Sequence, residues 1–148
     1  MRYLAKAAAP LLVILMTGCG GVADRETLEV RSKASQQAIG LTLPASARVI
    51  FADRMRGLDD AARIIAVMPA ADWRDLERRL LATVPDAAPP TREAVAHLGT
   101  DHDGWTPGKQ AQLTARQLPW RGGAESLNIG AAPAGPGMMR VFIFWFEI

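Results

Sequence analysis

Thiol groups are almost absent from this chain of 148 residues, which contains a single cysteine, Cys19. The part of the chain after Cys19 therefore has no disulfide, no thiolate zinc site and no cysteine nucleophile. A domain without thiols also suits an oxidising compartment, where a stray thiol is a liability.

The sequence also lacks a long hydrophobic run. Residues 7–16 are apolar but number only ten and are interrupted by Pro10, whereas a membrane-spanning helix needs about 20 apolar residues. Basic residues at positions 2 and 6 precede the run, and small residues at 17 and 18 follow it. This order of a basic segment, a short apolar segment and small residues is the layout of a secretory signal.

Residues 16–19, Met-Thr-Gly-Cys, resemble a bacterial lipobox, with Met16 where that family usually has leucine. The resemblance implies that residues 1–18 are a removed signal peptide and that acyl chains, palmitate among them, are attached to Cys19. Gly20 and Gly21 follow the cysteine in place of the aspartate that marks inner-membrane retention in many Gram-negative envelopes. By resemblance, the protein is an outer-membrane lipoprotein facing the periplasm. The alternatives are an ordinary signal peptide with an incidental cysteine, or a short uncleaved anchor.

The net charge of the chain gives no indication of nucleic-acid binding. The formal net charge is +2, and Arg2 and Lys6 of the signal segment account for all of it. The remaining chain is formally neutral, so the basic isoelectric point does not indicate nucleic-acid binding.

Periodicity predicts one α+β domain over residues 41–148, preceded by a polar tether over 19–40 that becomes helical near 32–39. Apolar residues alternate with arginines over 47–56, and with 63–68 this segment predicts a β-hairpin. Apolar positions spaced for one helical face predict a helix over 70–83. The other expected elements are short helices over 92–98 and 106–118 and strands over 125–131 and 138–148.

These elements predict a single antiparallel sheet of about four strands in the order ββα…ββ, with one main helix and short helices on one face. Residues 138–148 are apolar on both faces, which predicts that the last strand lies in the middle of the sheet. The pattern also loosely resembles small uncharacterised bacterial lipoproteins, through the segments 43–47 (LPASA) and 105–107 (WTP). That resemblance implies no activity.

Residues suited to catalysis or metal binding are few. His97 and His102 are five positions apart with a glycine between them, which is not the i,i+4 spacing that places two imidazoles on one helical face. With Asp101 and Asp103 they are interpreted as a solvated loop. Four acids are candidates for a pair of acid–base carboxylates: Glu93, Asp101, Asp103 and Glu125. No G-x-S-x-G or phosphate-binding loop occurs, so we predict no catalytic residue, metal or cofactor.

Arginines gather on the first predicted hairpin. If Arg48, Arg54 and Arg56 share one face, they form a basic strip. With Trp105, this strip is a candidate binding surface for an acidic protein or for anionic envelope polymers. The alternative is a solvated face on which nearby aspartates balance the arginines.

The sequence therefore favours a non-enzymatic, lipid-tethered protein-binding module in the envelope, for example an immunity or inhibitor-like lipoprotein. The alternative function is a small periplasmic ligand-binding protein or hydrolase that uses residues 86–123 as the wall of its site.

Overall fold

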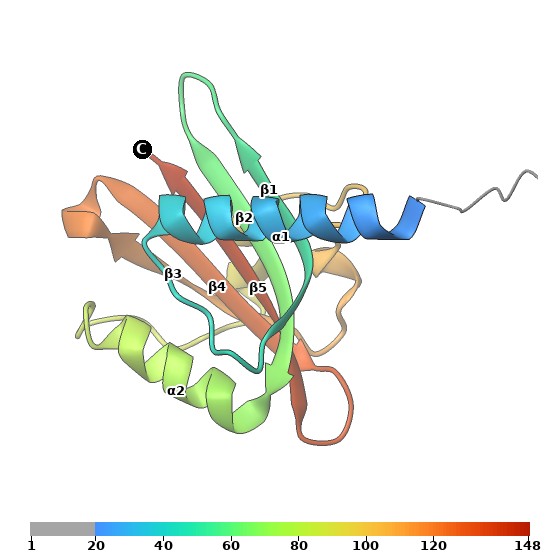
Figure 1. Ribbon diagram of the computed structural model, residues 1–148. Coiled ribbons are helices and arrows are strands. Elements are labelled where there is room, and N and C mark those ends of the chain that lie inside the picture. Colours follow the sequence, from blue (N-terminus) through green and yellow to red (C-terminus); the bar gives the residue numbers. More distant parts are fainter. Residues whose placement is uncertain (1–19) are drawn as a thin grey trace, which may run out of the picture.

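A five-stranded antiparallel sheet runs through the molecule in the order β1-β2-β5-β4-β3 (Figure 1). The computed structural model describes residues 20–148, with side chains from residue 27 onward, so Cys19 and the predicted signal peptide lie outside the described residues. The strands are β1 Arg48–Met55, β2 Ala61–Pro69, β3 Thr114–Trp120, β4 Glu125–Pro133 and β5 Met138–Glu147. The α+β class is confirmed, with five strands where about four were expected.

Strand β5 occupies the centre of the sheet, as its two apolar faces predicted. It pairs with β2 on one side and with β4 on the other. Ile143 and Trp145 are buried on the face that carries the two α-helices, and Phe142 is buried on the opposite face. Burial on both sides explains why polar residues are almost missing from this strand.

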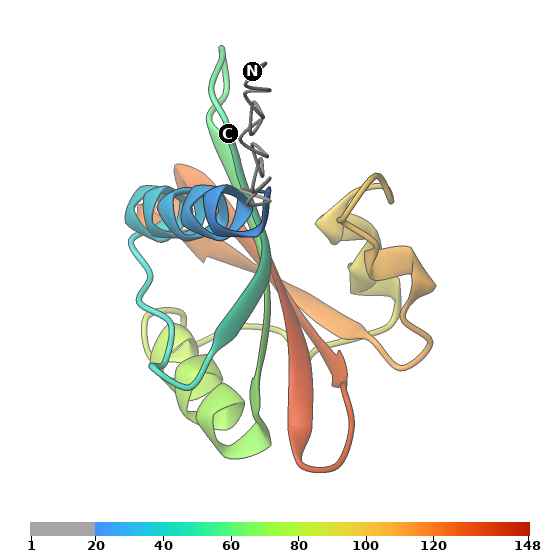
Figure 2. The same ribbon diagram turned by 45° about the vertical axis from the view of Figure 1, so that its right-hand side comes forward.

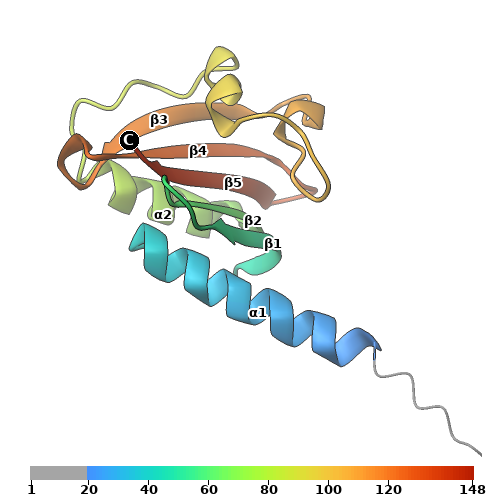
Figure 3. The same ribbon diagram turned by 90° about the horizontal axis from the view of Figure 1, so that it is seen from above.

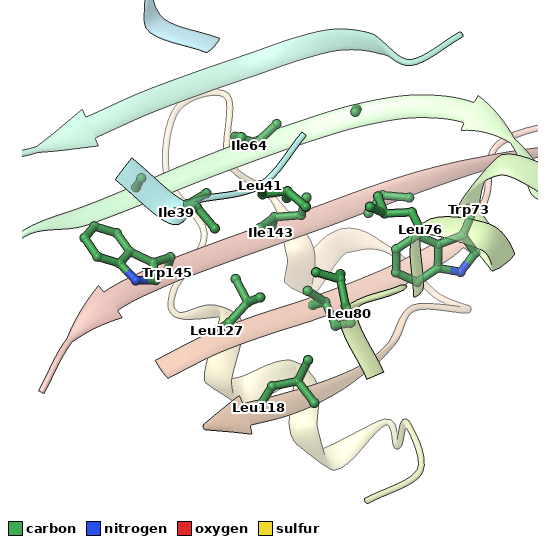
Figure 4. Close-up of a cluster of buried hydrophobic side chains, with 14 of the residues drawn as sticks. Ile39, Leu41, Ile64, Trp73, Leu76, Leu80, Leu118, Leu127, Ile143 and Trp145 are labelled. Carbon is green, nitrogen blue, oxygen red and sulfur yellow. The ribbon is translucent and has the colours of Figure 1, made fainter. Parts of the chain in front are cut away.

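Helix α2, Ala70–Leu81, packs on the sheet through Trp73, Leu76 and Leu80 (Figure 4). Asp72 in its first turn and Arg78 and Arg79 in its last turn complement the helix dipole. The helix predicted over 70–83 is therefore confirmed, and it ends two residues earlier than expected.

Helix α1, Gly20–Ile39, includes the helix expected near 32–39 and extends it over the segment expected to be a polar tether. Its C-terminal half lies alongside β1 (Figure 3), where Ser32, Ser35 and Ile39 are buried. The Ser35 hydroxyl donates to the backbone oxygen of Asp53 at 2.9 Å. Small serines that satisfy their hydroxyl groups in this way let a polar-looking helix pack closely on a strand. Over residues 20–148, no helix is both long enough and apolar enough to cross a bilayer.

The opposite face of the sheet is covered by the chain between residues 91 and 113 (Figure 2). Two short 3₁₀ helices lie in this segment, η1 Glu93–Leu98 and η2 Pro107–Lys109. Trp105, Leu98 and Leu113 are fully buried there, against Phe142. The expectation that all helices lie on one face is therefore wrong, because the side chains of this segment pack on the face of the sheet opposite α1 and α2.

Strand β3 includes residues 114–118, which were expected to form the last part of a helix over 106–118. Ala115 exchanges two backbone hydrogen bonds with Thr91, at 2.8 and 2.9 Å, on the side of β3 away from β4. Backbone groups alternate in direction along an antiparallel strand, so those of Pro119 also point outward. Its missing N–H therefore removes no bond to β4. A third 3₁₀ helix, η3 Arg121–Gly123, links β3 to β4.

Candidate functional site

The arginines of the first hairpin do not form the predicted basic strip. Arg48 lies opposite Val67 of β2, and Arg54 lies opposite Ala62. Opposed residues share a face and successive residues alternate, so Arg48 and Arg54 lie on opposite faces of the sheet. A β-bulge between Val49 and Phe51 causes the change, because one extra residue shifts the register of the strand.

The turn between β1 and β2 projects past the end of the sheet (Figure 1). We call residues 56–59 the hairpin tip. At its base Arg54 and Asp60 form an ion pair at 2.9 Å. Arg56 is exposed beyond that pair, and the Leu58 side chain is fully exposed. The tip therefore presents a cation (Arg56), an apolar side chain (Leu58) and a carboxylate (Asp59) on a turn whose base is held by an ion pair.

Arg63 of β2 is the centre of the largest polar cluster on the hairpin. Its Nε and Nη2 donate to the two carboxylate oxygens of Asp53 at 3.0 and 2.6 Å. Its Nη1 contacts Nε2 of His102, and its Cζ lies 5.7 Å from the centroid of the Trp105 ring. The Arg63 side chain is only 14% exposed. The Arg63 guanidinium thus joins the β1–β2 hairpin to the 91–113 segment, which covers the face of the sheet opposite α1 and α2.

Trp105 lies beneath this cluster and not on the surface. Its side chain is fully buried, and its Nε1 donates to the backbone oxygen of Leu98 at 3.0 Å. Its ring meets Phe142 edge-on, with 5.6 Å between centroids. The prediction that Trp105 forms part of a binding surface is therefore wrong, because a partner could not reach the ring. Trp105 does lie close to an arginine, but that residue is Arg63, and their contact lies inside the fold.

The histidines and acids of the 97–103 region are not brought together as ligands. His102 contacts Arg63, and the Asp101 carboxylate accepts the N–H of Gly108 at 2.7 Å. His97 is exposed in the last turn of η1. In residues 20–148, no three histidine, cysteine or acidic side chains form a group that could hold a metal ion.

Two of the four acids considered for a catalytic pair, Glu93 and Glu125, lie on opposite faces of the sheet. Glu125 accepts the Trp145 Nε1–H at 2.6 Å and pairs with Arg121 at 3.1 Å, on the face that carries α1 and α2. Glu93 begins η1 on the opposite face. The sheet therefore stands between these two carboxylates.

Cavities gather at the outer edge of β3. The one of about 440 Å³ lies between residues 83–88 and the edge of β3, and cavities of about 280 and 250 Å³ adjoin the same strand. Two others, of about 130 and 310 Å³, lie beside Arg116 and beside the end of α1. Neither histidine lines any of these five cavities. The β3 edge was not predicted from the sequence, because residues 114–118, which are most of this strand, were assigned to a helix.

Comparisons of the chain with known protein families, with curated proteins and with solved structures found no match.

Proposed function

We propose that this protein is a lipid-anchored envelope lipoprotein that binds another protein without catalysis, and that the hairpin tip is its contact surface. The observation that carries the proposal is the projecting tip, where Leu58 is fully exposed and Arg56 is free of the ion pairs that hold the hairpin. Burial of the exposed Leu58 side chain in a partner's apolar pocket would be favourable, and a projecting turn can reach such a pocket.

The ion pairs below the tip support the same function. Arg54–Asp60 and Arg63–Asp53 fix both strands of the hairpin close to the turn. A loop that is already ordered loses little conformational entropy when it binds, so more of its contact energy appears as affinity. Arginine is also enriched among residues that dominate interface energetics.

A convex tip needs a concave partner. Arg56 pairs best with a carboxylate, and Leu58 requires an apolar pocket beside it. An acidic cleft with an apolar floor has both properties, and a protein inserted there would block the cleft. Such binding is what an immunity or inhibitor-like lipoprotein requires.

The alternative, a ligand-binding protein or hydrolase that uses residues 86–123, has one supporting observation. Residues 86–88 line the cavity of about 440 Å³ beside β3. Asp86 is the only titratable side chain in that lining, whereas glycan hydrolysis of the usual kind uses two carboxylates. The cavity therefore fits binding better than hydrolysis.

A charge reversal at the tip tests the main proposal. We expect the double variant Arg56→Glu/Leu58→Asp to keep its melting temperature and to lose at least tenfold in affinity for an envelope protein that the wild type captures. Arg48→Glu is the control for the arginine, because it makes the same charge change as Arg56→Glu at the other end of β1. Equal capture by all three proteins would contradict the role of the tip.

A further inference from the structure

The two edges of the sheet are protected to different extents. At the β1 edge, α1 runs alongside the strand and Ser35 bonds to the backbone oxygen of Asp53. At the β3 edge, the only backbone–backbone hydrogen bonds between the strand and the described segment that passes by are those of the Thr91–Ala115 pair. Exposed edges are templates for pairing with another strand, so β3 is the edge to examine.

Three backbone groups at this edge point outward without a partner in the described chain. Ala115 turns its N–H and C=O away from β4, toward Thr91. By the alternation of antiparallel pairing, residues 117 and 119 turn the same way. The unpaired groups are therefore the N–H and C=O of Gln117 and the C=O of Pro119, and both residues are exposed.

Among the described residues, the passing segment forms no backbone hydrogen bond with these groups, and proline limits how it could. An antiparallel continuation from Thr91–Ala115 would place Pro89 opposite Gln117, and proline has no N–H to donate. The backbone oxygen of Ala88 is already taken by Nη1 of Arg116 at 3.1 Å. Residues 83–88 therefore lie away from the edge strand. The cavity of about 440 Å³ opens between these residues and β3.

Two further cavities lie on either side of the same edge. One, of about 250 Å³, is lined by Trp120 and Arg121, on the α-helical side of the sheet. The other, of about 280 Å³, is lined by Gln117 and Ser126, whose side chains lie on the opposite side. All three cavities share Pro119. An added strand would direct alternate side chains to the two sides of the sheet, where these two cavities lie.

We propose that the β3 edge at Gln117–Pro119 binds an extended segment of a partner polypeptide as a sixth strand. The segment gains main-chain hydrogen bonds from Gln117 and Pro119, and alternate side chains occupy the two flanking cavities. Arg121 is paired with Glu125, which leaves Asp86 as the one unpaired charge in the three linings. An uncharged segment with small apolar side chains suits this groove.

This site is independent of the hairpin tip. The tip belongs to β1 and β2, at the other end of the strand order from β3. A failure of either proposal therefore leaves the other intact.

Hydrogen exchange at one amide tests the site. The probe is the uncharged peptide acetyl-Thr-Val-Thr-Val-Thr-amide, added at millimolar concentration to the full chain in detergent. We expect the Gln117 amide to exchange rapidly without peptide, and at least tenfold more slowly with it. A control peptide that is N-methylated at all five residues has no residue N–H along either of its edges, and it should give no protection.

Two variants separate the backbone group from its side chain. Gln117→Pro removes the edge N–H and should abolish binding, whereas Gln117→Ala keeps the N–H and should bind within threefold of wild type. If Gln117→Pro fails to fold, the two peptides decide the question on the wild type. Equal binding by both variants, or no protection of Gln117 by the unmodified peptide, would overturn the proposal.

Discussion

At the scale of single residues, Arg63 shows how a surface pattern in the sequence became an internal contact. All three guanidinium nitrogens are engaged, two with Asp53 and one with His102, and the group lies near the Trp105 ring. Three positions spread over more than fifty residues, Asp53, His102 and Trp105, thus converge on the Arg63 side chain. Their types were visible in the sequence, but their convergence depends on where the 91–113 segment folds.

Removing Asp53 tests this convergence. Asp53→Asn leaves the largely buried Arg63 guanidinium without its carboxylate, and loss of a charged partner costs about 1–3 kcal/mol of unfolding free energy. Arg48→Ala is the control, because that exposed side chain has no ion pair and the change should stay within about 0.5 kcal/mol. Urea denaturation of both variants measures the difference, and equal midpoints would show that the Asp53 pair contributes nothing.

Trp105 provides a second test at this scale. Trp105→Phe leaves a void and strips the Leu98 carbonyl of its donor, so we expect a loss of about 1–3 kcal/mol in unfolding free energy. Protein binding should persist at temperatures where the variant is folded. Unchanged stability with lost binding would instead place Trp105 at an interface.

At the scale of elements, burial on one or two faces decided what the sequence could predict. The first hairpin, α2 and the last two strands follow from apolar periodicity, and the central place of β5 follows from its two apolar faces. Strand β3 was missed because it buries only Ala115 on one face and Leu118 on the other. The bulge at Ile50 was also missed, since its residues read as a regular strand.

Helix α1 is the element whose role changed most. Besides its contacts with β1, its last carbonyls receive distant donors: Trp120 Nε1 bonds to the Ile39 oxygen and Arg121 Nη2 to the Ala38 oxygen, both at 2.8 Å. These bonds satisfy groups that every helix leaves open at its C-terminus. A ragged apolar stripe concealed this docking, because the partners lie about eighty residues away.

Truncation of one side chain distinguishes a docked helix from a tether. Ile39 is fully buried, so Ile39→Ala should lower the unfolding free energy by about 2–5 kcal/mol. Val30 on the same helix is 62% exposed, and Val30→Ala should change it by less than about 0.5 kcal/mol. Thermal melts of the two variants are compared with wild type, and a neutral Ile39→Ala would mean that α1 is not part of the domain.

At the scale of the whole molecule, the two proposed contact surfaces lie at opposite edges of one sheet, and the proposed anchor precedes α1 directly. Helix α1 has 20 residues, about 30 Å at 1.5 Å per residue. An acylated Cys19 would therefore hold the sheet within reach of the membrane surface and leave the hairpin tip and the β3 edge open to a partner. Two or more acyl chains make such attachment lasting.

The anchor is tested most directly by intact-mass spectrometry of the protein purified from its native membrane. We predict a product that begins at Cys19 and carries the mass of at least two acyl chains, and we predict that Cys19→Ser removes both the added mass and the membrane association. A native product with an unmodified Cys19 thiol, or one that retains residues 1–18, would contradict the proposal.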